Sequence, residues 1–186
     1  MASGPDEEAV SRLRRRDPRG FDLAYAAYAA RVRAFLLRLS GRKDVADDLV
    51  QHTFLRLAER GPELTAGSDL RAWLFTVARN AYFGRVRAMG AESDDGALEG
   101  LASPAPDVEA RLLLGDVERA LGALRVEDRE LLLLVGVEGM EPAQVARILD
   151  VDPAALRQRL SRARARLLAS LERLPASRAR TKRTLP

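Results

Sequence analysis

The recurrence of apolar residues at every third or fourth position constrains this chain more than any other feature. Between residues 21 and 39 the recurring residues are Phe21, Tyr25, Tyr28, Val32, Phe35 and Leu39. Because an α-helix turns once in about 3.6 residues, this spacing places all of these side chains on one helix face. The segment therefore predicts a long amphipathic helix that ends near Ser40-Gly41.

The same spacing continues along the chain and predicts an all-α fold. Further helices are expected over about 44–60, from 70 onward, from 108 onward and over about 128–137, where Gly139 ends the last of them. Ser68 or Asp69 is the expected cap of the helix that begins at residue 70. Its periodicity directs Leu70, Trp73, Leu74, Val77 and Ala81 inward, and Arg71, Arg79, Asn80, Tyr82 and Arg85 toward solvent or a ligand.

A segment without periodicity separates two sets of predicted helices. Residues 90–106 are rich in Gly, Ser, Pro and acidic residues, which is typical of a flexible linker. We therefore expect an N-terminal extension over 1–19, a helical domain over 20–89, the linker over 90–106, a second helical domain over 107–174, and a basic disordered tail over 175–186.

The chain lacks residue types that most enzyme classes need for catalysis, which argues against an enzymatic function. It has no Cys and one His, so disulfides, thiolate zinc sites and thiol nucleophiles are excluded, and a Ser/His triad is hard to assemble. It also has no glycine-rich phosphate loop. We expect neither an enzyme nor a metal or cofactor site. With no apolar run near the roughly 20 residues that span a bilayer, and no signal peptide, we expect a cytoplasmic protein without membrane insertion.

Charge is distributed unevenly, although the formal net charge is only +4. Residues 1–89 carry 16 basic and 11 acidic side chains, residues 90–152 carry 5 and 15, and residues 153–186 carry 10 and 1. A basic end beside an acidic middle is typical of a protein with a nucleic-acid partner on one face. Apart from Lys43 and Lys182, every basic residue is Arg. Arg side chains suit contacts with phosphate, but a GC-rich genome explains the same preference for Arg equally well.

Residues 141–167 carry the sharpest local signal. Pro142 and Pro153 each follow an acidic residue that can cap a helix, Glu141 and Asp152, and a tight turn separates the two helices. This pattern predicts a helix-turn-helix, whose second helix would meet base edges in a major groove. The outward residues that would read the DNA are Arg157, Gln158, Ser161, Arg162 and Arg164. The alternative is an Arg-rich face that is merely solvated.

Three stretches of the chain resemble the extracytoplasmic-function class of bacterial sigma factors. They are Asp47-Asp48-Leu-Val-Gln51-His-Thr-Phe54-Leu-Arg-Leu, Leu70-Arg-Ala-Trp73-Leu-Phe-Thr-Val-Ala-Arg79-Asn80, and Leu156-Arg-Gln-Arg159-Leu-Ser-Arg-Ala-Arg164-Ala-Arg-Leu. The resemblance covers about residues 20–88 and 108–172. It implies that the partners are core RNA polymerase, promoter DNA and an anti-sigma protein. It also implies that the protein associates with the nucleoid when it is in the holoenzyme.

The resemblance also implies a role for individual residues. The polymerase-binding helix would present Asp47, Asp48, Gln51, Phe54 and Leu55. The −10 element would be opened beside Arg71, Trp73, Arg79, Asn80 and Arg85, and the −35 element would be read by the outward residues of the helix-turn-helix. By the residues alone, Asp47, Gln51 and Leu55 lie four apart and form one exposed stripe. The alternative for this stripe is an ordinary solvated helix face.

Two other functions stay open at this stage. A sigma-like decoy would bind only a regulator of sigma factors, and His52, where the family usually carries Glu, is its only support. A stand-alone helix-turn-helix repressor would dimerise through its N-terminal domain and bind a palindromic site. Asp150 also replaces a usual Gly in the tight turn, which is tolerable because Asp adopts left-handed backbone better than most residues.

Overall fold

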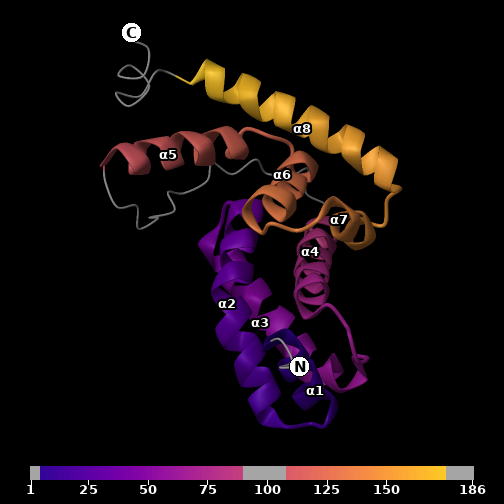
Figure 1. Ribbon diagram of the computed structural model, residues 1–186. Coiled ribbons are helices and arrows are strands. Elements are labelled where there is room, and N and C mark those ends of the chain that lie inside the picture. Colours follow the sequence, from indigo (N-terminus) through magenta and orange to yellow (C-terminus); the bar gives the residue numbers. More distant parts are fainter. Residues whose placement is uncertain (1–4, 90–107, 175–186) are drawn as a thin grey trace.

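The computed structural model describes residues 5–89 and 108–174, and every element of regular secondary structure in these residues is a helix (Figure 1). The predicted all-α fold is confirmed. The expected linker over 90–106 and the expected tail over 175–186 lie outside the described residues.

The N-terminal half is a bundle of four helices. These are α1 (Pro5–Arg14), α2 (Pro18–Ser40), α3 (Lys43–Arg60) and α4 (Leu70–Ala88), with a short 3-10 turn η1 (Gly61–Glu63) after α3. The side chain of Asp17 accepts from the backbone N–H of Arg19 at the start of α2, and Gly41 ends that helix in left-handed backbone at φ 70°. Asp69, one of the two caps that the sequence predicts, caps α4 by accepting from the N–H of Ala72.

Residues 5–14 come from the segment that the sequence places in an N-terminal extension. They form α1, which buries Ala9, Val10 and Leu13 against the rest of the bundle. Its Asp6 carboxylate accepts a hydrogen bond of 2.6 Å from the hydroxyl of Tyr28 on α2. The first helix is therefore part of the packed N-terminal half.

The C-terminal half contains α5 (Val108–Gly122), α6 (Val126–Leu132), a π-helical turn η2 (Leu133–Val137), α7 (Pro142–Leu149) and α8 (Pro153–Arg173). The tight turn between α7 and α8 places Asp150 in left-handed backbone at φ 52°. Asp152 then caps α8 by accepting from the N–H groups of Ala154 and Ala155. These contacts make the predicted helix-turn-helix.

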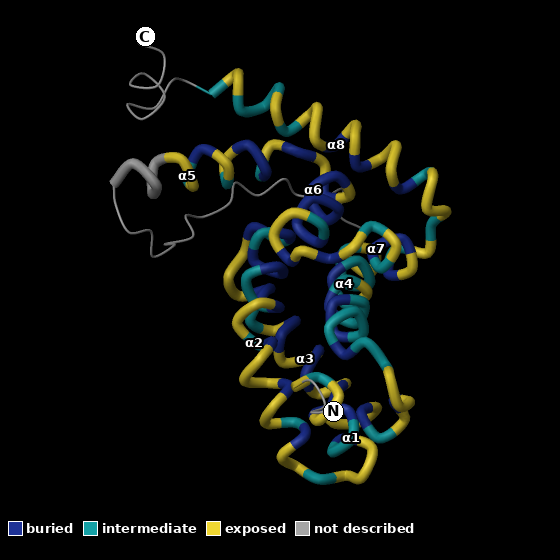
Figure 2. Tube along the Cα trace, viewed as in Figure 1, coloured by how far each residue is buried: buried dark blue, intermediate teal, exposed yellow. Residues whose placement is uncertain are grey.

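Figure 2 shows that buried residues run along the inner faces of the helices of both halves. Leu, Val, Ala and Phe side chains form most of the core in the N-terminal half, and Leu, Val and Ala form most of it in the C-terminal half. Phe35 of α2 meets Phe75 of α4 edge to face at 5.2 Å between ring centroids. In the C-terminal half the fully buried residues include Leu133, Leu134, Val145 and Leu156. Leu156 joins α8 to this core, and so the opposite face of α8 is left outward.

Two aromatic residues lie elsewhere than the sequence analysis expects. Phe54 was placed with the polymerase-binding residues, but only 3% of it is exposed, and its ring packs 4.8 Å from that of Tyr25. Tyr82 was expected to face solvent or a ligand, but it is buried and packs against Phe83. The two cases have different causes. Phe54 is covered by aromatic rings of α2, whereas Tyr82 continues the buried row of Leu74 and Ala78 at four-residue spacing on α4.

Candidate polymerase and nucleic-acid interface

The outward face of α8 carries all five residues that were predicted to read DNA. Arg157, Gln158, Ser161, Arg162 and Arg164 are exposed, whereas Leu156, Leu160 and Ala163 on the opposite side are buried. The tight turn and the Asp152 cap fix where α8 begins, and so they fix which residues lie in its first exposed turns. Arg and Gln side chains there can each make two hydrogen bonds to a base edge.

A partly buried ion pair holds α8 against the rest of its domain. The guanidinium of Arg166 lies 2.6 Å from the carboxylate of Asp128 on α6, and only 10% of the Asp128 side chain is exposed. The guanidinium of Arg166 is therefore engaged in an ion pair within its own domain. The exposed residues earlier in α8 are the candidates for contacts with a ligand.

The stripe on α3 is partly engaged within the bundle. Asp48, Gln51 and Leu55 are exposed, and Leu55 is 60% exposed despite being apolar. Asp47 is ion-paired with Arg33 of α2 at 2.6 Å, and Asp48 with Arg85 of α4 at 3.4 Å. Gln51 and Leu55 thus form the part of this surface that lies outside the ion pairs of Asp47 and Asp48.

The residues of α4 predicted to lie beside the −10 element do not form one free surface. Trp73 is half-buried and packs against the core, while Asn80 is exposed and accepts from Arg79 at 3.0 Å. Arg85 is the partner of Asp48. The guanidinium of Arg79 lies 5.0 Å from the centroid of the Phe83 ring. Arg71 and Arg79 both reach residues of the C-terminal half.

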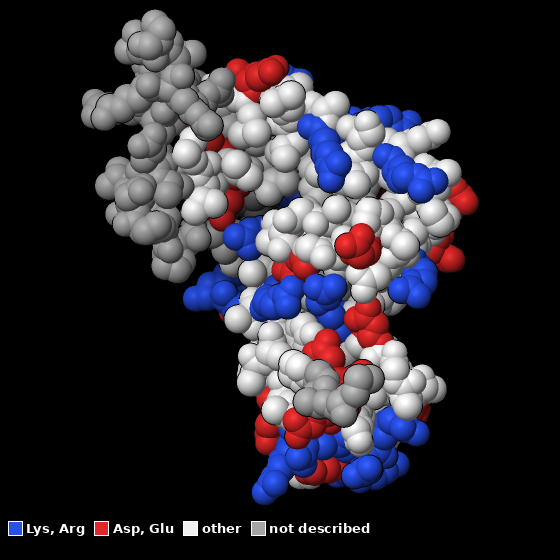
Figure 3. Space-filling view, viewed as in Figure 1, with Lys and Arg blue, Asp and Glu red and all other residues white. Residues whose placement is uncertain are grey.

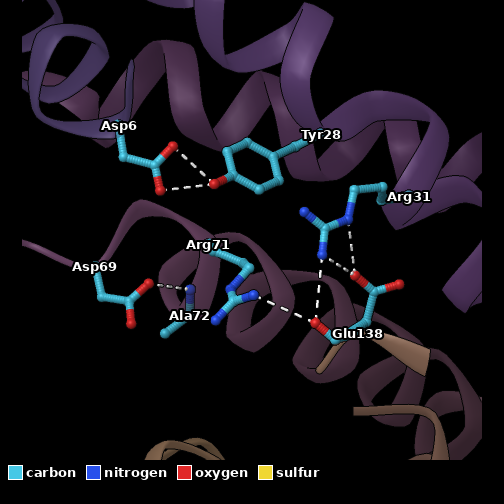
Figure 4. Close-up of polar contacts among 7 residues, drawn as sticks. All are labelled: Asp6, Tyr28, Arg31, Asp69, Arg71, Ala72 and Glu138. Atoms are coloured by element: carbon cyan, nitrogen blue, oxygen red, sulfur yellow. Dashed lines mark hydrogen bonds and ion pairs between the residues drawn. The ribbon is translucent and has the colours of Figure 1, made fainter. Parts of the chain in front are cut away.

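The two halves of the chain meet through charged and polar side chains. Figure 3 shows basic and acidic side chains mixed at the junction of the two halves. In Figure 4, Glu138 accepts from two arginines of the N-terminal half: Arg31 lies 2.8 Å from its carboxylate, and Arg71 donates to its backbone carbonyl at 3.2 Å. Only 5% of the Glu138 side chain is exposed. Burial raises the pKa of this carboxyl, and the nearby Arg31 opposes that shift.

A second pair of contacts joins α4 to α6 and α7. The Nε atom of Arg79 lies 2.5 Å from the carboxylate of Glu130, whose side chain is 3% exposed. Burial raises the pKa of the Glu130 carboxyl, although its hydrogen bond with Arg79 lowers it. Next to this pair, Gln144 of α7 donates to the Asp69 carboxylate at 2.6 Å. Asp69 therefore caps α4 with one oxygen and binds α7 with the other.

Sequence reasoning missed these junction residues of the C-terminal half. The available signal was the charged run Glu127-Asp128-Arg129-Glu130, which directly precedes the apolar run over 131–137. Charged side chains in such a segment are rarely buried without partners, so they indicate contacts within the protein. The partners themselves lie 51 to 107 residues away along the chain.

Two further classes of site are absent from the described residues. In that part of the chain, no three His, Asp or Glu side chains gather as metal ligands would. None of its helices combines the length and apolarity needed to cross a bilayer.

Comparison with known proteins matches both halves of the chain to sigma factors. Sigma-70 region 2 matches residues 24–90, and Sigma-70, region 4 matches residues 114–167. The ECF RNA polymerase sigma factor EcfG of Rhodopseudomonas palustris is 37% identical over 142 residues, which are 75% of this chain and 78% of that protein. The ECF RNA polymerase sigma factor SigL of Mycobacterium tuberculosis is 34% identical, over 83% of this chain and 90% of that protein.

Two solved structures share the fold. The sigma factor RpoE in complex with the anti-sigma factor NepR from Bartonella quintana is 32% identical with a TM-score of 0.68, covering 83% of this chain and 98% of that chain. CnrH in complex with the cytosolic domain of CnrY has a TM-score of 0.70, covering 91% of this chain and 98% of that chain. At 24% identity, this second likeness concerns the fold alone.

Proposed function

Because the chain belongs to the ECF class of RNA polymerase sigma factors, we propose that it binds core RNA polymerase through α3 and directs it to promoters that α8 and α4 recognise. A factor of this class acts as a regulatory subunit of transcription initiation. The observation that carries the proposal is the exposed row of Arg157, Gln158, Ser161 and Arg162 on a capped second helix of a helix-turn-helix.

Two consecutive groups of residues in the first half of α8 would divide the work on the −35 element. Its first exposed turns carry Arg157, Gln158 and Ser161, which suit base edges in the major groove. Arg162 and Arg164 follow and suit phosphates, which position the helix without reading sequence. Substitutions in the first group would therefore change promoter choice, and those in the second would weaken binding to all sequences.

The −10 element would be held by α4 and the loop that precedes it. Arg71 and Arg79 supply positive charge for the strand backbone, and Asn80 supplies an amide for a base. Trp73 is half-buried, so its contribution would be to support the loop from the core side. Taking a base out of the stack costs a few kcal/mol, and these contacts would compensate for that cost.

An anti-sigma protein is the third proposed partner. The solved relative RpoE forms a complex with the anti-sigma factor NepR, and this chain is 32% identical to it. The exposed apolar residues Leu113, Leu114 and Leu168 of the C-terminal half would suit the apolar face of such a protein.

Assembly with core RNA polymerase tests the proposal most directly. We would change Gln51→Arg together with Leu55→Arg, because both side chains are exposed and neither residue is a member of the ion pairs that Asp47 and Asp48 form. Co-elution of the wild-type chain with bacterial core polymerase on a sizing column is expected, and the double variant should lose it. A matched control, Ala66→Arg with Met89→Arg, adds the same charge at exposed positions of the same half and should co-elute normally.

The contrary results are equally specific. A folded wild-type chain that does not bind core polymerase would overturn the proposal. Protection of a −35 element would then leave a repressor, and no DNA binding would leave a decoy. Binding that survives the Gln51/Leu55 change would show that the polymerase-binding face was assigned to the wrong helix surface.

A further inference from the structure

We propose that the turn between α1 and α2 is a further site for nucleic-acid phosphates, which holds a promoter strand beside the loop over 61–69. Residues 14–19 of this turn are called the basic turn below. This inference rests on the proposed function, because it takes the loop before α4 to hold that strand. It adds a DNA contact that neither α4 nor α8 supplies.

The basic turn carries a positive charge that the fold leaves unbalanced. Its exposed basic side chains are Arg14, Arg15, Arg16 and Arg19. The one acidic residue of the turn is Asp17, and its carboxylate is already paired with Arg12 at 2.8 Å. Among the described residues, none of the four exposed arginines has an ion-pair partner. A group of unpaired guanidinium groups attracts an anion that carries several charges, as a nucleic-acid backbone does.

The C-terminal half leaves the basic turn uncovered. The turn between α1 and α2 lies at the end of the N-terminal half that is farther from the C-terminal half (Figure 1). Figure 3 shows Lys and Arg side chains gathered at that end, with some acidic ones among them. A strand could therefore reach the basic turn without any rearrangement of the described helices.

Arg16 occupies a backbone position that disfavours it. The N–H of Arg16 donates to the carbonyl of Leu13, and the N–H of Asp17 to the carbonyl of Arg12, both at 3.0 Å. These two bonds end α1 with Arg16 in left-handed backbone at φ 58°. Glycine usually ends a helix in this way, because a Cβ atom is strained there. A GC-rich genome does not explain the arginine, since glycine codons are rich in G as well. A function of the side chain explains it better than the fold does.

Arg19 also lies where its charge is locally unfavourable. It is the second residue of α2, and the first turn of that helix contains no acidic residue. The N-terminal end of a helix carries a partial positive charge, which disfavours a cation. Arg14 differs, because it lies in the last turn of α1, where the helix dipole favours positive charge. Arg16 and Arg19 are therefore the two arginines that carry the proposal.

The basic turn is fixed to the start of the loop over 61–69. A Cβ atom at Gly61 would lie 3.0 Å from the Cδ2 atom of Leu13, so the end of α1 packs closely on η1. Arg16 follows Leu13 by three residues, which span at most about 11 Å. At roughly 3.4 Å for each nucleotide of a strand, this distance is about three nucleotides. A strand held in the loop would thus meet the arginines after a few nucleotides.

DNA fits the basic turn better than a membrane surface does. Segments that lie on a membrane combine basic residues with Trp, Phe or Leu side chains that enter the lipid. Residues 14–19 include no such side chain. The basic turn instead offers charge alone, which suits the sequence-independent contacts that position a strand.

The first test removes the two charges from the full chain. The variant is Arg16→Gly with Arg19→Gln, and the probe is a fluorescein-labelled single-stranded DNA of about 20 nucleotides. We expect the affinity to fall about three- to tenfold at low salt. The slope of log affinity against log salt should become shallower by about 1.4, because each lost phosphate contact removes about 0.7.

A matched control separates this site from net charge. Arg42→Gln with Lys43→Gln also removes two charges at exposed positions, in the turn at the other end of α2. Its affinity and salt slope should stay close to those of the wild type. Equal effects in the two variants would overturn the proposal.

Thermal stability gives a second readout. Arg16→Gly relieves the left-handed backbone, and Arg19→Gln removes a cation from the positive end of α2, so Tm should rise by about 2 to 4 °C while DNA binding falls. Arg16→Lys with Arg19→Lys keeps both charges and should bind DNA as the wild type does. Weaker DNA binding together with a lower Tm would mean that the arginines support the fold, and this result would overturn the proposal.

Crosslinking tests the location of the strand. The chain has no Cys, so a benzophenone can be attached to Asp22→Cys, an exposed position of α2 near the basic turn, or to Lys43→Cys as the control. Light should crosslink the DNA to the first position only. An equal yield at both positions would contradict the proposal. Vesicles of phosphatidylcholine and phosphatidylglycerol test the lipid alternative: if the Arg16/Arg19 variant loses vesicle binding but keeps DNA binding, the basic turn is a lipid site and the proposal is wrong.

Failure of this inference is distinct from failure of the proposed function. The Arg16/Arg19 variant should co-elute with core RNA polymerase as the wild type does, because α3 is unchanged. Co-elution with undiminished DNA binding would remove the basic turn and leave the function. A wild-type chain that does not co-elute, beside a variant that binds DNA more weakly than its control, would remove the function and leave the basic turn as a nucleic-acid site.

Discussion

Arg129 is a buried residue whose guanidinium donates to backbone carbonyls at the ends of two helices. It reaches Leu121, Gly122 and Leu124 at the C-terminal end of α5 with distances of 2.7 to 3.0 Å. It also donates to Leu39 near the end of α2 at 3.2 Å. The last carbonyls of a helix lack partners within the helix, and a positive charge there also favours the helix dipole. One side chain thus completes helix ends in both halves of the molecule.

Replacing this side chain should be costly. Arg129→Ala would leave several buried carbonyls without a donor, so we expect the free energy of unfolding to fall by about 2 to 4 kcal/mol. Urea denaturation followed by circular dichroism measures it. Arg125→Ala, whose side chain is 72% exposed, is the control and should change stability by less than about 0.5 kcal/mol. Similar stabilities of the two variants would contradict this role of Arg129.

The docking of α1 on α2 shows how one element depends on the absence of a side chain. A Cβ atom at Gly20 would lie 2.6 Å from the backbone nitrogen of Leu13 and 2.9 Å from the carbonyl oxygen of Ala9. Both atoms belong to the backbone of α1, and they cannot move aside as a flexible side chain could. The close approach also lets Asp6 reach Tyr28, whose pKa is raised chiefly by burial and further by this hydrogen bond.

Gly20→Ala should therefore displace α1. We expect a loss of about 1 to 3 kcal/mol in stability and faster amide hydrogen exchange in residues 5–14. Gly84→Ala on α4 is the matched control, because a Cβ there meets no atom within 4 Å. It should stabilise the chain by about 0.5 to 1 kcal/mol through helix propensity. Unchanged exchange in α1 of the Gly20 variant would refute the close packing.

At the scale of the whole molecule, the junction buries carboxylates whose pKa values are raised by that burial. Burial raises the pKa values of Glu118, Glu130 and Glu138 above the ordinary value of 4.5, against the opposing effect of their arginine partners. When the pKa is higher in the folded than in the unfolded chain, the folded chain binds more protons between the two values. Stability then falls as pH rises from about 4.5 through the raised pKa.

The pH dependence of Glu130→Gln tests this sign. Gln keeps the shape of the side chain but has no proton to lose, so the variant should gain stability relative to wild type as pH rises above about 4.5. The gain should level off once the wild-type carboxyl is fully ionised. Unfolding curves in urea between pH 4.5 and 8 measure the difference, and the exposed Glu172→Gln should show no such trend. A difference that shrinks with rising pH would contradict the prediction.

Local features of this protein could be read from its sequence. The three- and four-residue spacing of Phe21 to Leu39, the caps at Asp69 and Asp152, and the tight turn at Asp150 all depend on residues that lie close together in the chain. Helix periodicity and capping act over one or two turns. For this reason the all-α fold, the helix-turn-helix and the exposed face of α8 followed from the residues alone.

What joins the two halves was decided only by the tertiary structure. The pairs Arg79 with Glu130 and Arg31 with Glu138 are 51 and 107 residues apart, and no local pattern specifies which arginine meets which carboxylate. The sequence by itself determined each helix and its apolar face, because these arise from neighbouring residues. The tertiary structure decided which charged residues are covered, because that depends on how complete helices pack together.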